Sequence, residues 1–101
     1  MTDETKWEPF DASRYLNDEE TIAEYLRLSM DDENPDIFLL ALADVAKARG
    51  MAHVAATAGL GRESLYKALT PGTRPRYDTI KRVLNALNLR ITVVPSAPAG
   101  T

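Results

Sequence analysis

The 101-residue sequence contains no cysteine and a single histidine, His53. The missing thiols exclude disulfides, zinc fingers and cysteine catalysis, and no carboxylate lies close enough to His53 in sequence to suggest a catalytic or metal-binding pair. A glycine-rich phosphate loop, a metal-ligand spacing and a nucleophile elbow are also missing from the sequence. We therefore expect a protein that is not an enzyme and that needs no cofactor or metal.

Long apolar runs are missing as well. No stretch of the sequence approaches the roughly 18 apolar residues that a membrane-spanning helix requires, and no basic segment followed by an apolar one stands at the N-terminus. The hydrophobic share of 45% is ordinary for a globular chain. The sequence therefore predicts one cytoplasmic globular domain without a membrane partner.

Positive charge is scarce in the first half of the chain. Residues 1–49 carry 13 acidic and 5 basic side chains, a balance of −8, whereas residues 50–101 carry 2 acidic and 7 basic, a balance of +5. Six basic side chains gather within 21 residues of the second half: Arg62, Lys67, Arg74, Arg76, Lys81 and Arg82. Such a cluster is typical of phosphate contacts, although a solvated charged face would have the same composition.

Residues 54–69 predict two short helices joined by a tight turn. Gly59 stands at the bend, where a positive φ is accessible to glycine without steric cost. Apolar side chains such as Val54, Ala55 and Leu65 would lock the helices together, and the polar ones of the second helix would point outward. This pattern is typical of a helix-turn-helix, whose second helix enters the DNA major groove. A purely structural helical hairpin is the alternative interpretation.

Capping signals place the remaining helices at 18–30, 35–49 and 77–87, with a single turn at 12–16. Asn17 and Glu20 resemble a capping box, Asn34-Pro35 is a strong helix start, and Asn88 is a candidate left-handed cap. Residues 90–94 alternate and are β-branched, so they predict a short strand. An isolated strand is unstable, so this one would pair with its copy in a dimer or with another protein. Residues 95–101 are expected to be a disordered tail.

A family resemblance covers most of the chain. It rests on Phe10-Asp11, Tyr15-Leu16, Tyr25-Leu26, Ala41-Leu42, residues 46–51 and above all residues 60–69, Leu-Gly-Arg-Glu-Ser-Leu-Tyr-Lys-Ala-Leu. In these segments the chain resembles the addiction-module antidote proteins, a HigA-like antitoxin family, and residues 35–88 resemble a lambda-repressor-like (Xre-type) domain. The family's Gly-Asn-Pro loop and late glycine are replaced here by residues 72–75 and by Asn88.

The resemblance implies the antitoxin of a type II toxin–antitoxin module. Such a protein neutralises a small basic RelE/ParE-like toxin by direct binding, and it represses its own operon as a homodimer on double-stranded operator DNA. The implied fold is all-α, a lambda-repressor-like helix-turn-helix bundle with an N-terminal helical arm and a short C-terminal β-strand. The implied organisation is an acidic arm at 1–34, a DNA-binding domain at 35–94 and a tail at 95–101.

The resemblance also nominates site residues. The expected DNA contacts are Gly61, Arg62, Glu63, Ser64, Tyr66, Lys67, Arg74, Arg76 and Lys81. The expected toxin contacts are Trp7, Phe10, Tyr15, Tyr25 and Leu26. Two other interpretations stay open: a stand-alone prophage-type transcriptional regulator, and an interaction module that no longer binds DNA. The acidic arm could likewise serve solubility alone.

Overall fold

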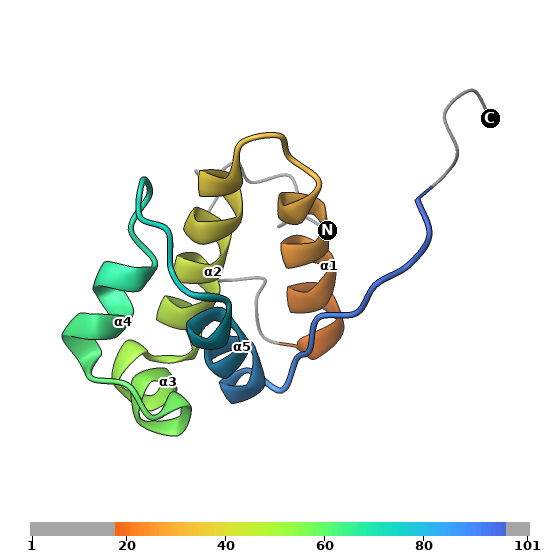
Figure 1. Cartoon of the computed structure of the whole chain (residues 1–101). Coiled ribbons are helices and arrows are strands. Elements are labelled where there is room, and N and C mark those ends of the chain that lie inside the picture. Colours follow the sequence, from red (N-terminus) through yellow and green to blue (C-terminus); the bar gives the residue numbers. More distant parts are fainter. Residues whose placement is uncertain (1–17, 97–101) are drawn as a thin grey trace, which may run out of the picture.

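The computed structural model describes residues 18–96. Its order of elements is α1 (Glu19–Met30), α2 (Pro35–Arg49), α3 (Met51–Ala58), α4 (Arg62–Ala68) and α5 (Tyr77–Ala86). Helices α2 and α5 lie in the middle of the molecule, with α1 on one side and the α3–α4 pair on the other (Figure 1). All the regular structure in the described residues is helical, which confirms the all-α prediction.

Helix α1 begins one residue later than the capping-box interpretation requires. Asp18, not Asn17, is the N-cap, and its carboxylate accepts hydrogen bonds from the Thr21 N–H at 2.7 Å and the Thr21 hydroxyl at 3.0 Å. These bonds favour the charged carboxylate and lower the pKa of Asp18. Ile22 and Leu26, four residues apart in this helix, lie on the same face and are buried in the core.

Helix α2 begins as predicted. The Asn34 side chain accepts a hydrogen bond from the Asp36 N–H at 2.9 Å, and Pro35 occupies the first helical position, where its missing N–H costs no bond. Gly50, expected as a left-handed helix end, has a φ of 100° with a ψ of 108° and so lies outside the left-handed helical region. It ends α2 and caps α3 at once, since α3 begins at the next residue.

The ends of α3 and α5 share one geometry. Gly59 (φ 75°, ψ 30°) and Asn88 (φ 64°) are both left-handed, which confirms both predictions. After each, one N–H reaches back five residues to a carbonyl: Leu60 to Ala55 and Leu89 to Leu84, each at a distance of 2.9 Å or less. These bonds satisfy carbonyls that a helix end would otherwise leave without partners.

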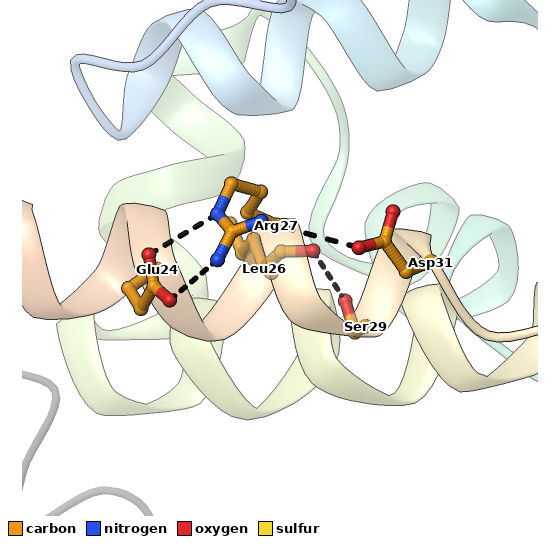
Figure 2. Close-up of polar contacts among 5 residues, drawn as sticks. All are labelled: Glu24, Leu26, Arg27, Ser29 and Asp31. Atoms are coloured by element: carbon orange, nitrogen blue, oxygen red, sulfur yellow. Dashed lines mark hydrogen bonds and ion pairs between the residues drawn. The ribbon is translucent and has the colours of Figure 1, made fainter. Parts of the chain in front are cut away.

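One hydrophobic core joins the five helices. Helix α1 packs on α2, α2 on α3, and α3 on both α4 and α5. The largest fully buried side chains come from every helix and from the residue after α5: Ile22, Leu42, Val45, Val54, Leu65, Val83 and Leu87. Burying each contributes about 1.5–3 kcal/mol. Ser29, a buried polar side chain, donates its hydroxyl to the Leu26 carbonyl at 2.7 Å (Figure 2).

The strand predicted at 90–94 is wrong for the isolated chain, because residues 90–96 form neither helix nor strand. Ile91 is half-buried against the core, whereas Val93 is 91% exposed. The segment has the β-branched composition of a strand, but within residues 18–96 no second strand is there to hydrogen-bond with it. The turn predicted at 12–16 and most of the tail predicted at 95–101 lie outside the described residues.

Candidate nucleic-acid interface

The outer face of α4 is polar and exposed. The glycine and the five polar side chains predicted for DNA contact in this region are all exposed: Gly61, Arg62, Glu63, Ser64, Tyr66 and Lys67. The Arg62 guanidinium carbon lies 5.8 Å from the centroid of the Tyr66 ring, within the range of a cation–π contact. Because the two residues are one turn apart, this contact holds the arginine side chain along the helix surface.

The inner face of α4 packs against α3, and this packing leaves the polar outer face of α4 exposed to solvent. Leu65 has no exposed surface, and on the neighbouring helix α3 Val54 is fully buried and Ala55 is only 2% exposed. The small Ala55 side chain leaves room for α4 to pack closely. The tight turn of residues 59–61, which begins at the left-handed Gly59, then fixes where α4 starts.

Neither the backbone conformation nor the space around position 61 requires a glycine. Gly61 is the N-cap of α4 with a φ of −71° and a ψ of 151°, a conformation open to every residue. A Cβ atom there would meet only the Ser64 hydroxyl oxygen, at an ordinary 3.8 Å. The exposed backbone at this position is therefore free to approach another molecule closely.

The positive charges of this region are not neutralised locally. Within residues 18–96, no ion pair engages Arg62, Lys67, Arg74 or Arg76. One of the two acids in the basic half, Asp78, is paired with Arg82 at 3.3 Å. Unpaired cations on an exposed face are available for phosphate groups, and each such contact would release a counterion.

The loop between α4 and α5 is held by hydrogen bonds. The Gly72 N–H donates to the Asp36 carboxylate at 2.9 Å, which ties the loop to the first turn of α2. The Thr73 hydroxyl lies 2.7 Å from the Thr70 carbonyl and 3.2 Å from the Ala68 carbonyl. The loop therefore presents Arg74 from a defined position. The hydrogen bond between Gly72 and Asp36 joins residues that are 36 positions apart in the sequence. No local sequence pattern predicts such a contact, so Asp36 was not among the expected site residues.

The beginning of α5 adds an aromatic residue that the sequence analysis did not nominate. Tyr77 is 63% exposed, and the Lys81 ammonium lies 5.8 Å from the centroid of its ring. Lys81 thus contacts its own helix rather than α4. The signal in the sequence was the position of Tyr77 among basic residues, directly after Arg76.

The residues nominated for toxin contact divide into three groups. Trp7, Phe10 and Tyr15 lie outside the described residues. Leu26 is 4% exposed and belongs to the core, so it offers little surface to a partner. Tyr25 is half-buried, and its hydroxyl donates to the Asp44 carboxylate of α2 at 2.9 Å. Burial, and then the bond to this carboxylate, raises the pKa of Tyr25 to about 12.

Metal and membrane features are scarce in the part of the chain that the structure describes. No three His, Asp or Glu side chains in residues 18–96 gather closely enough to hold a metal ion. His53 is an exposed residue of α3. None of the helices between residues 18 and 96 has the length and apolar character needed to cross a membrane.

Comparison with known proteins decides the family. Residues 6–95, most of the chain, match the family described as "Probable addiction module antidote protein". The chain belongs to this antidote family. The match runs through all five helices and supports the resemblance seen in residues 60–69.

One relative matches the chain over nearly its whole length. The chain is 41% identical over 96 residues to an uncharacterized protein of Haemophilus influenzae (strain Rd), and the alignment covers 95% of the chain and 97% of the relative. The two proteins therefore correspond over nearly their whole lengths. No solved structure matches the antidote significantly.

Proposed function

We propose that this antidote is the antitoxin of a type II toxin–antitoxin module. It neutralises a small basic RelE/ParE-like toxin by direct binding, and it represses its own operon by sequence-specific binding to double-stranded DNA. Membership of the antidote family supports a toxin partner. The observation that carries the DNA-binding role is the outer face of α4, which is exposed and keeps its positive charges unpaired.

In this proposal α3 and α4 act as a lambda-repressor-like helix-turn-helix. The start of α4 enters the major groove, where Arg62 can bind guanine with two hydrogen bonds and Glu63 can accept one from cytosine N4. The close approach that Gly61 leaves open suits a helix start pressed against the groove. Arg74, Arg76 and Lys81 contact phosphates and set the register without reading sequence.

A homodimer would complete the interface. Two copies of α4 about 34 Å apart would meet successive major grooves on one face of the duplex, so the operator would contain two related half-sites. This arrangement needs no catalysis and no cofactor. It also suits a cytoplasmic protein, since both proposed partners are met there.

Two experiments test the proposal. DNA from the protein's own promoter should be retarded in a gel by the purified antidote, whereas a shuffled sequence of equal length should not. A gene for a small basic protein should lie beside the antidote gene, expression of that protein should arrest growth, and co-expression of the antidote should restore it. Retardation without rescue would favour a stand-alone prophage-type regulator, and rescue without retardation would remove the DNA-binding role.

A further inference from the structure

Three large apolar side chains are exposed on the α1–α2 hairpin. Leu28 and Met30 of α1 are 56% and 48% exposed, and Leu40 of α2 is 46% exposed. Single exposed leucines are common on protein surfaces and need no explanation. Two that adjoin on neighbouring helices form a patch, and apolar patches surrounded by polar residues mark interaction sites.

The register of the hairpin places the two leucines on the same side. The bond between the Tyr25 hydroxyl and the Asp44 carboxylate fixes which turns of α1 and α2 face one another. Leu28 lies three residues after Tyr25, and Leu40 lies four residues before Asp44, so each shares a helix face with its bonded neighbour. Because the helices are antiparallel (Figure 1), both steps lead towards the connecting turn. We call Leu28 and Leu40 the leucine patch.

Acidic side chains lie one helical turn from the leucine patch. Glu24 precedes Leu28 by four residues within α1, and Asp36 and Asp44 stand four residues before and after Leu40 within α2. Asp36 and Asp44 accept hydrogen bonds from a backbone N–H and a tyrosine hydroxyl, both neutral donors, so their negative charges remain.

The one basic residue of α1 is already paired. Arg27 forms ion pairs with Glu24 and Asp31 (Figure 2), at distances of 2.6 Å and 3.9 Å. Residues 18–49 as a whole carry 9 acidic and 3 basic side chains, a balance of −6. An apolar centre within a charged rim has the anatomy of a protein interface.

We propose that the leucine patch is the docking site for a basic protein surface, with the leucines buried at its centre and the acidic rim matched to the partner's positive charges. This inference rests on the proposed function, because the basic partner would be the toxin. A second copy of this chain fits poorly, since a two-fold contact would bring one acidic rim against the other. Nucleic acid is repelled for the same reason.

The test measures binding of the full-length antidote to the small basic protein encoded beside it. Leu28→Ala and Leu40→Ala should each weaken the affinity by about tenfold, and added salt should weaken binding further. Alanine is the strongest helix former, so the thermal unfolding midpoint should not fall. Val93→Ala is the matched control, because Val93 is a 91% exposed apolar residue outside the hairpin, and it should bind like the parent.

Each other outcome overturns a distinct statement. If the parent does not bind the basic protein, both the proposed toxin partner and the proposed docking site are wrong. If the parent binds and both leucine variants bind equally well, the docking site alone is wrong. Loss of affinity in Val93→Ala alone would place the partner on the C-terminal segment. A parent dimer that separates in the Leu28→Ala, Leu40→Ala double variant would make a second copy the occupant.

Discussion

Replacement of Gly59 by alanine isolates the energetic cost of a left-handed turn. Gly59 has a φ of 75° and a ψ of 30° between α3 and α4. A Cβ atom built on it would meet no other atom within 4 Å, so alanine would cause no clash. The neighbouring hydrogen bonds, from the Gly59 N–H to Ala56 and from the Leu60 N–H to Ala55, use backbone atoms that alanine keeps. The substitution therefore changes backbone strain and little else.

The magnitude follows from that strain. A residue with a Cβ in the left-handed region costs about 1–2 kcal/mol, so Gly59→Ala should lower the free energy of unfolding by this amount. For a domain of this size, each 1 kcal/mol lowers the unfolding midpoint by roughly 4–8 °C. Gly59→Asn should cost less than alanine, because asparagine tolerates the left-handed region, as Asn88 does here with a φ of 64°.

Thermal and urea unfolding followed by circular dichroism would measure the series. Gly61→Ser is the control two residues away. It should not lower stability, because the φ of −71° is open to every residue, the Cβ contact is ordinary, and serine is a favoured N-cap. An unchanged midpoint for Gly59→Ala would refute the left-handed turn. A loss well above 2 kcal/mol would show that the space beside Gly59 is occupied in solution.

Three further outcomes are expected. Tyr25→Phe should lower stability by about 1 kcal/mol at neutral pH, and in a pH titration of unfolding the parent should lose the extra stability as pH rises from 10 to about 12, because the folded state holds the phenolic proton more tightly. Ala55→Glu should cost about 3 kcal/mol or more by burying a charge, whereas Ala56→Glu, at an exposed neighbour, should melt like the parent. In binding titrations, Arg62→Ala should lose roughly 1–3 kcal/mol of binding free energy on operator DNA alone. Arg76→Ala should weaken binding to both operator and random DNA, and it should reduce the slope of log affinity against log salt concentration by about one. Equal losses on both DNAs for Arg62→Ala would show that Arg62 does not read bases.

Local chemistry made several helix ends predictable. Asn34-Pro35, Gly59 and Asn88 each act through their own backbone conformation or through bonds to residues nearby in the chain. The cap of α1 was missed by one residue because Asn17 and Asp18 are both good caps. The structure uses Asp18, whose carboxylate accepts hydrogen bonds from both the N–H and the hydroxyl of Thr21.

Contacts between distant segments were not predictable in the same way. The Tyr25–Asp44 and Gly72–Asp36 hydrogen bonds join residues 19 and 36 apart, and they exist because α1 and the α4–α5 loop both pack beside α2. The exposure of Leu28 is another example, since an apolar residue at helical spacing favours burial until the neighbouring helix is placed. The strand at 90–94 failed for a related reason, because β-propensity cannot supply the partner that a strand needs.

The C-terminal segment around Val93 and Val94 should be cut by proteases faster than the helical core. Proteases bind extended backbone, and they cut helices only after local unwinding. Around Val93 and Val94 the chain is neither helix nor strand and runs away from the helices (Figure 1), and both side chains are largely exposed. Among the described residues, a cut between them would remove no fully buried side chain, because Leu87 is the last buried residue of that part of the chain. Cleavage at this point would leave the buried core of the five helices intact.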